Sequence, residues 1–286
     1  MTGLAIALVL AAAFIHATWN LLAKRASGGA AFTWLFAALS GVFYTPIAAA
    51  IIFLWQAPLG VVELGFMAGS AILHTAYFVL LNQGYRVGDL SLVYPLARGT
   101  GPLLSSAAAI AFLGERPTAI ALSGGLLIVV GVVVLTSNPE RLRQTGARKA
   151  VLYALLTGTF IAGYTLLDKQ AVSAFSISPL LLDWGANLGR ALLLTPFALR
   201  HWDKACLEWQ NHRFEAIGVA LLAPLSYILV LSALTFTAVS YVAPAREISI
   251  LIGTAMGTGL LGEGDVPRRL AAAVAMVLGV VALAVG

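Results

Sequence analysis

The stretch Leu90–Pro117, LSLVYPLARGTGPLLSSAAAIAFLGERP, has the length and apolarity of a membrane-spanning helix, yet it contains an arginine. A similar stretch, VSYVAPAREISILIGTAMGTGLLGEGDVP, occupies residues 239–267. Arg98 of the first stretch aligns with Arg246 of the second, at an offset of 148 residues (246 − 98 = 148). A charged side chain at the centre of a bilayer costs about 2.5–3.5 kcal/mol on insertion scales, so it is a functional-site hypothesis by default. The two stretches together predict a duplicated transport protein.

The composition of the chain is that of a membrane protein. Of its 286 residues, 60% are hydrophobic and 10% are charged, whereas soluble domains carry about 25% charged residues. The first apolar run, Gly3–Ala23, has no basic segment before it, so we expect a retained helix rather than a cleaved signal. The single cysteine, Cys206, excludes an intrachain disulfide and offers no cysteine metal site. The net charge of +5 is explained by basic loops beside the membrane rather than by nucleic-acid binding.

The fold class that this pattern predicts is an all-α membrane protein with ten transmembrane helices. Most of the helices have about the 20 apolar residues that cross ~30 Å of hydrocarbon. The polar segment 138–149 joins a first five-helix repeat, 1–137, to a second one, 150–286, and another polar connection is expected at 200–215. The predicted helices are 3–23, 31–54, 59–84, 90–113, 117–136, 150–171, 178–199, 214–237, 239–262 and 266–285.

The two halves match helix by helix, in order. One such match would be chance in a chain so rich in Leu and Ala, but five in order indicate an internal duplication. Besides the arginine stretches, the matches are ATWNLLAK (17–24) with AGYTLLDK (162–169), Trp34 and Thr45-Pro46 with Trp184 and Thr195-Pro196, Tyr77 and Leu81 with Tyr227 and Leu231, and GVVVL from Gly131 with GVVAL from Gly279.

The number of helices in each repeat determines how the repeats are related. Because five is odd, the second copy must cross the membrane in the opposite sense, which predicts an inverted repeat with a site at the midplane and alternating access. Basic residues indicate the orientation: twelve follow odd-numbered helices, whereas only Arg116 and Lys169 follow even-numbered ones. The positive-inside rule then puts the odd-numbered connections in the cytoplasm and both termini outside.

At this point the sequence resembles the EamA-type members of the drug/metabolite transporter superfamily. The residues that carry the resemblance are HATWNLLAK (16–24), LNQGYRVGDLSLVYPLARGTGP (81–102), Gly114-Glu115 and Gly262-Glu263. The resemblance implies two inverted five-helix repeats, a central cavity and no ATPase module. It also implies export or exchange of amino acids, nucleotide sugars, organic acids or phosphorylated metabolites. Family members usually have cytoplasmic termini, which disagrees with the charge distribution of this chain.

Arg98 is the first candidate substrate-binding residue. It lies eight residues into its predicted helix, or ~12 Å at 1.5 Å per residue, and Tyr94 is one turn earlier on the same face. A guanidinium pairs with carboxylate or phosphate through two parallel hydrogen bonds, so Arg98 and Tyr94 are candidates for an anion clamp. The alternative is a structural arginine satisfied by backbone carbonyls, because Gly99, Gly101 and Pro102 favour a bent helix.

Arg246 and Glu247 are the second candidate pair. On a continuous helix, adjacent side chains lie ~100° apart, so each needs a partner elsewhere. Pro244 removes a backbone donor just before them, and we expect the helix to open there. Either one binds substrate while the other forms a salt bridge between repeats, or both belong to a buried pair that only neutralises charge. Glu115 and Glu263, at helix ends, are expected to be structural.

A polar stripe follows the seventh predicted helix. Asp183, Asn187 and Arg190 are four and three residues apart, so they share one face, and Trp184 is adjacent. Such a stripe should face a cavity or another helix rather than lipid. The carboxylate could neutralise a substrate ammonium group or take part in proton coupling, or the three side chains could satisfy one another.

Histidines and aromatic residues on two further helices complete the candidate site. A histidine within a span shuttles protons or donates to substrate, although a lone one is commonly a hydrogen-bonded structural residue. A tryptophan can stack on a ring, although in spans it commonly packs or lies at the membrane interface. The candidates are His16, Trp19, Asn20, His74, Tyr77 and, as the counterpart of Tyr77 in the second repeat, Tyr227.

The motifs of enzymes are missing from the sequence. It contains no Gly-x-x-x-x-Gly-Lys-Ser/Thr loop, no His-Glu-x-x-His and no Gly-x-Ser-x-Gly, so we expect neither catalysis nor a cofactor or metal.

We therefore expect a secondary transporter or facilitator of small polar metabolites in a bacterial inner membrane. Amino-acid export is the leading hypothesis, because Arg98, Arg246, Asp183 and Glu247 match a zwitterion. Sugar phosphates, nucleotide sugars and organic acids are alternative substrates. The other class considered is a non-transporting scaffold or lipid-carrier subunit of an envelope-assembly complex. The expected partners are a small-molecule substrate and the lipid bilayer, without nucleic acid, for a monomer or alternatively a dimer.

Overall fold

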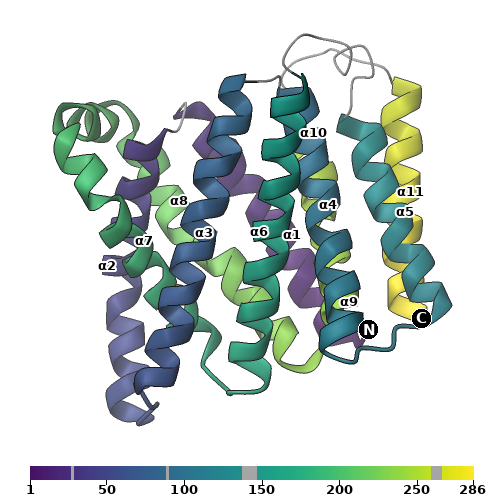
Figure 1. Ribbon diagram of the computed structural model, residues 1–286, viewed down its shortest axis with the longest axis horizontal. Helices are drawn as coiled ribbons and strands as arrows, with labels where there is room; N and C mark the ends of the chain where they lie inside the picture. Colours follow the sequence, from purple (N-terminus) through teal and green to yellow (C-terminus); the bar gives the residue numbers. More distant parts are fainter. Residues whose placement is uncertain (27–28, 88–89, 137–146, 259–265) are drawn as a thin grey trace.

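The computed structural model of the chain describes residues 1–26, 29–87, 90–136, 147–258 and 266–286. For a few residues inside the helices, Tyr94 among them, only the backbone is described. Every regular element within these ranges is an α-helix, which confirms the predicted fold class (Figure 1). The helices are α1 Gly3–Arg25, α2 Ala30–Leu54, α3 Val61–Val87, α4 Leu90–Phe112, α5 Ala119–Thr136, α6 Ala147–Ser173, α7 Pro179–Arg200, α8 Trp202–Phe236, α9 Val239–Ala245, α10 Ile248–Thr258 and α11 Val266–Val285.

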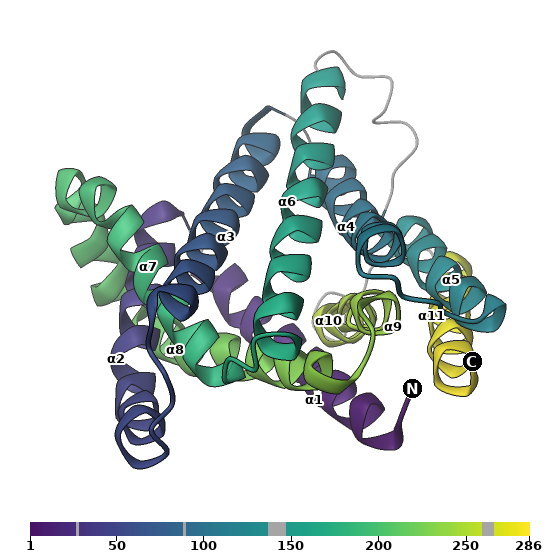
Figure 2. The same cartoon turned by 60° about the horizontal axis from the view of Figure 1, so that its bottom comes forward.

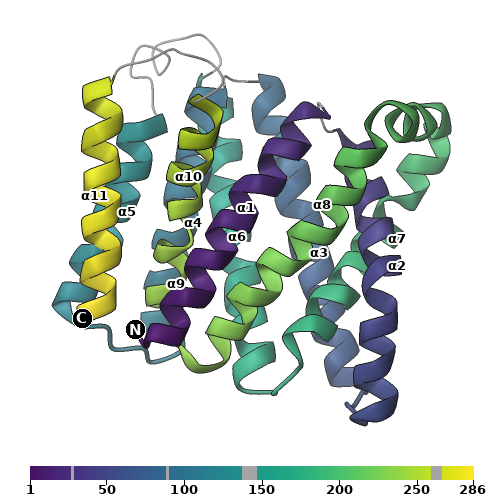
Figure 3. The same ribbon diagram turned by 180° about the vertical axis from the view of Figure 1, so that it is seen from behind.

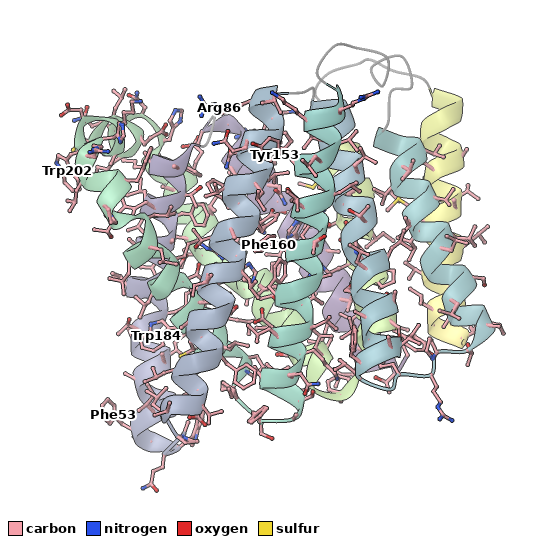
Figure 4. The ribbon with its side chains drawn as sticks, viewed as in Figure 1. Phe53, Arg86, Tyr153, Phe160, Trp184 and Trp202 are labelled. Atoms are coloured by element: carbon pink, nitrogen blue, oxygen red, sulfur yellow. The ribbon has the colours of Figure 1, made fainter. Side chains whose placement is uncertain are left out.

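The helices distribute their side chains as a membrane protein does, with apolar groups outside and charged groups inside. Within the described residues, α1, α2, α3, α6 and α8 are each long and apolar enough to cross a bilayer. Large apolar side chains such as Phe112 remain more than 80% exposed on the outer surface, while Asp168 and Glu247 are at most 1% exposed. Phe53 and Trp202 likewise lie on the periphery (Figure 4). Lipid tails solvate the apolar outer surface, and the interior holds the polar groups that lipid cannot solvate.

The two repeats run in opposite senses across the bundle, as predicted. α1 starts at the end that holds both termini and runs to the opposite end, whereas α6 starts at that opposite end and returns (Figures 1 and 3). α5 and α11 are antiparallel in the same way. The packing repeats as well: α1 lies along α8 as α6 lies along α3, while α2 faces α7 and α5 faces α11. The arrangement is that of two five-helix units related by a flip about an axis in the membrane plane.

A reciprocal pair of hydrogen bonds between α2 and α7 shows this symmetry at atomic level. The indole Nε1 of Trp34 donates to Thr195 Oγ1 at 3.1 Å. The indole Nε1 of Trp184 donates to Thr45 Oγ1, also at 3.1 Å. Because Trp34 aligns with Trp184 and Thr45 with Thr195, each bond is the image of the other under exchange of the repeats.

Two predicted segments differ from the structure. The expected connection 200–215 is itself helical from Trp202, and a kink where His212 leaves helical backbone geometry (φ −132°, ψ 30°) separates it from the predicted helix 214–237. The segment is polar but contains neither Gly nor Pro, so its residues still form a helix. The ninth predicted helix, 239–262, is divided into α9 and α10 at Arg246 and Glu247. These two pieces lie between α1, α4 and α6 (Figure 2).

Candidate functional site

The site begins at the gap between α9 and α10. Here N–H groups bond to the carbonyl three residues earlier instead of four: Glu247 to Pro244 at 3.0 Å and Ile250 to Glu247 at 2.9 Å. The helix opens just after Pro244, at the place that the sequence predicted. Arg246 Nε and Glu247 Oε1 approach to 3.8 Å, although adjacent side chains on one helix were not expected to face each other. Each of the two residues also has a partner elsewhere, as expected.

Arg98 of the first repeat reaches the same carboxylate. Its Nε lies 3.0 Å from Glu247 Oε2, and the two side chains are 9% and 2% exposed. Arg98 is ~12 Å from the start of α4, and Arg246 is ~10 Å from the start of α9, which enters from the opposite end. The three residues therefore meet in the middle of the bundle. We call Arg98, Arg246 and Glu247 the arginine group, and its formal charge is one positive.

A second polar group surrounds Asp168, which the sequence analysis did not single out. Asp168 of α6 is 0% exposed. Its Oδ2 accepts a hydrogen bond of 2.6 Å from the hydroxyl of Tyr227 on α8, and the same atom lies 3.4 Å from His74 Nε2 on α3. Within the described residues, Oδ1 of the same carboxylate has no hydrogen-bond partner. We call Asp168, His74 and Tyr227 the acid group.

Tyr164 of α6 connects the two groups. Its hydroxyl accepts a hydrogen bond of 3.0 Å from Arg246, while its ring stacks on His74 with a centroid separation of 3.9 Å. The rings of Tyr77 and Tyr227 meet the Tyr164 ring edge-on, at 6.0 and 6.2 Å. Tyr164 was also missed, although a signal was present: it aligns with Trp19 in the repeat match. Asp168 lies in the same match but precedes Lys169, which made it resemble a residue at a helix end.

The residues of the polar stripe on α7 do not all interact with one another. Asn187 Nδ2 donates to Asp183 Oδ2 at 3.0 Å and to its carbonyl at 2.9 Å, and both residues are buried. This is the self-satisfied arrangement, for the first two residues of the stripe. Arg190 instead lies within electrostatic range of Asp183 and of the three tyrosines around His74, and its Nε has no partner within the described residues. The stripe therefore contributes one more cation to the interior.

The remaining candidates lie in several places. His16 and Trp19 of α1 meet edge-on at 4.8 Å, and His16 is within electrostatic range of Arg98 and Arg246. The indole nitrogen of Trp19 is buried without a partner among the described residues. Asn20 is exposed and donates to the backbone of its own helix at 2.8 Å. Trp184 donates to α2 rather than to either polar group, and the side chain of Tyr94 lies outside the described residues.

One end of the bundle is held by charged side chains that bind backbone. Glu115, just after α4, accepts hydrogen bonds of 2.6 and 2.9 Å from the first two N–H groups of α9. Lys169 donates to the carbonyls of Leu234 and Thr237, at the end of α8, at 2.7 and 3.0 Å. Each charge thus satisfies backbone groups that a helix terminus leaves unpaired. Glu115 has the structural role expected of it, and it joins the two repeats.

Comparison with known proteins agrees with this architecture. The family model described as "EamA-like transporter family" matches twice, over residues 3–137 and 148–285. A solved structure described only as "Crystal structure of protein" superposes with a TM-score of 0.76 at 14% sequence identity, covering 98% of each chain, which shows a shared fold. Among curated protein sequences there is no significant match. Most of the predicted linker, 138–149, lies outside the described residues, and α6 begins at Ala147, so the division into two domains there stays a prediction.

Proposed function

Because the chain belongs to the EamA-like transporter family, we propose that it is a secondary transporter of small polar metabolites that works by alternating access. The observation that carries the proposal is the arginine group, in which one residue of each repeat meets the same carboxylate, Glu247. A bacterial inner membrane is the proposed location. The basic last turns of α1, α3 and α7 lie at the end opposite the termini, which favours termini on the outer side.

The arginine group suggests how an anionic substrate is held. Glu247 lies between two guanidinium groups, so a substrate carboxylate competes with it for the same hydrogen-bond donors. Arg98 belongs to the first repeat and Arg246 to the second, so movement of one repeat against the other changes the distance between them. A carboxylate that bridges both arginines therefore binds one arrangement of the repeats better than another, which is the condition for coupling binding to movement.

Amino acids are the proposed substrates, with export as the proposed direction. The buried charges are balanced, since Arg98, Arg190 and Arg246 stand against Asp168, Asp183 and Glu247. A zwitterion with an apolar side chain suits such a mixture together with the tyrosines around His74. A sugar phosphate or nucleotide sugar would favour an excess of basic groups, and an organic acid would leave the interior carboxylates without a partner. A monomer suffices for this function, because the two repeats already supply both halves.

A transport assay with the purified protein in liposomes tests the proposal. The panel contains L-leucine, glucose 6-phosphate and succinate as labelled probes, and we expect uptake of L-leucine alone. Arg98→Ala should abolish uptake, while Arg116→Ala, which removes an exposed arginine at the end of the bundle, should leave it unchanged. Arg98→Lys keeps the charge but loses the paired hydrogen bonds, so it should retain the helical circular dichroism of the wild type with reduced uptake.

A membrane scaffold or lipid-carrier subunit is the second candidate. The observation that favours it is the pairing of interior polar groups with one another, as in Asp183 with Asn187. For a scaffold, none of the probes should be transported or should raise the melting temperature of the purified protein. For a transporter, a bound substrate stabilises the folded state by mass action, by about 2.7 kcal/mol at a hundredfold excess over Kd.

A further inference from the structure

We propose that Asp168 and His74 form a proton-binding site, and that a proton bound there favours binding of a carboxylate at the arginine group. The coupling to carboxylate binding rests on the proposed transport function, whereas the proton-binding site does not. Neither residue is assigned such a role by the family match.

The geometry of the acid group favours a proton as its ligand. An ionised carboxylate buried without compensation is costly, and here the neighbours of Asp168 Oδ2 are an imidazole at 3.4 Å and a phenol hydroxyl at 2.6 Å. An ionised Asp168 beside a neutral His74 carries one negative charge, and one added proton on either residue makes the pair neutral. The proton therefore belongs to the pair rather than to one residue. Oδ1 is buried and has no partner among the described residues, which leaves it free to carry a hydrogen atom.

His74 is the more accessible member of the pair. Asp168 is fully buried, but the side chain of His74 is 11% exposed and contacts the same oxygen as Tyr227. Aromatic rings lie close around the imidazole, with Tyr164 stacked at 3.9 Å and Tyr227 edge-on at 5.3 Å. A proton needs no additional volume in such packing. Within the described residues, no three His, Cys, Asp or Glu side chains converge as metal ligands do.

The duplication supports a role beyond folding. Under the offsets of the repeat match, Asp168 corresponds to Ala23 (168 − 145 = 23) and His74 to Pro224 (74 + 150 = 224). Tyr227, in contrast, corresponds to Tyr77. The α1–α8 interface therefore packs like the α3–α6 interface with neither an acid nor a histidine at these two equivalent positions. Since the fold forms at the equivalent position without this pair, the pair is not required by the architecture.

The contacts of Tyr164 link the proton site to the arginine group. The charged and titratable groups that face the pair are Arg190 and Asp183 from α7, Arg246 from the α9–α10 break, Tyr164 from α6, Tyr77 from α3 and Tyr227 from α8. The positive charges of Arg190 and Arg246 oppose proton binding at His74. A carboxylate bound to Arg246 cancels part of this field, so the proton and the carboxylate bind cooperatively. By linkage, each raises the affinity for the other by the same factor.

Infrared spectroscopy of the full-length protein in lipid tests the proton site without any substrate. On lowering the pH, the wild type should gain a carbonyl band of a protonated buried carboxyl group that is missing from the spectrum of Asp168→Asn. Tyr227→Phe keeps both titrating residues and the ring packing but removes the 2.6 Å hydrogen bond, so it should retain the band with a changed midpoint. Asp203→Asn, at an exposed site on α8, is the control and should keep the band of Asp168. An unchanged spectrum in Asp168→Asn, with its helical content intact, would overturn the proposal.

The coupling is tested with L-leucine in liposomes that contain a pH-sensitive dye. Addition of L-leucine should move protons in the same direction as the amino acid in the wild type, and His74→Gln should transport L-leucine without proton movement. Proton movement that persists in both His74→Gln and Asp168→Asn would refute the coupling. If L-leucine is not transported at all, the transport function fails, and the infrared band still decides whether Asp168 binds a proton.

Discussion

Glu247→Gln leaves Arg98 and Arg246 side by side without the carboxylate between them. The ion pairs at 3.0 and 3.8 Å are worth about 5.5 and about 4.4 kcal/mol by Coulomb's law at an effective dielectric constant of about 20, before desolvation and the repulsion between the arginines are subtracted. Removing one partner of a buried pair costs about 3–5 kcal/mol, because a charge is left uncompensated, and we expect a loss of that size in the free energy of unfolding.

Arg98→Gln should cost less, because Glu247 then remains paired with Arg246 and the group is neutral. The double variant Arg98→Gln/Glu247→Gln should be more stable than the sum of the single losses predicts, with a coupling of about 0.5–3 kcal/mol. Asp203→Asn, at an exposed site on α8, is the control and should change stability by about 0.5 kcal/mol or less.

The assay is equilibrium unfolding in mixed micelles of a mild detergent and dodecyl sulfate, followed by tryptophan fluorescence. Fluorescence suits this chain because its six tryptophans report on helix packing. Equal losses for Glu247→Gln and Asp203→Asn, together with additive single and double variants, would show that the carboxylate does not hold the arginines together.

Three further changes test the packing of the repeats. Gly124→Ala on α5 would place a Cβ 2.6 Å from the carbonyl oxygen of Gly279 on α11, so it should destabilise the protein by about 1–3 kcal/mol. Gly65→Ala, whose Cβ would meet open space, is the control and should not destabilise it. Equal melting temperatures of the two variants would contradict the close helix contact. Glu115→Ala removes both acceptors from the start of α9 and should cost about 1 kcal/mol, and unchanged hydrogen exchange at the first amides of α9 would argue against this cap. Trp184→Phe keeps the ring but loses the bond to α2, so a loss of about 1 kcal/mol is expected, and an unaltered unfolding midpoint would count against that bond.

Much of the fold follows from local properties of the chain. Apolar runs of the right length predict the spans, and an odd number of spans in each copy predicts that the copies are inverted. Pro244 predicts an interruption in the ninth span, because proline is unfavourable inside a helix. The same local reasoning missed the helix that starts at Trp202, since polarity marks a segment that leaves the hydrocarbon but does not decide whether that segment is helical.

The partners of the interior charges depend on tertiary structure. His74 and Asp168 are 94 residues apart in the chain, and Trp184, predicted at the substrate site, donates to α2 instead. The spans are apolar on nearly every face, so their sequences carry little amphipathic signal to show which face turns inward. The sequence by itself determined an inverted, duplicated helical membrane protein with charges in its spans, because length, hydropathy and helix number act locally. Only the packing of the helices decided that one carboxylate joins the two arginines and that Asp168 meets His74, because such contacts depend on how each helix is rotated against its neighbours.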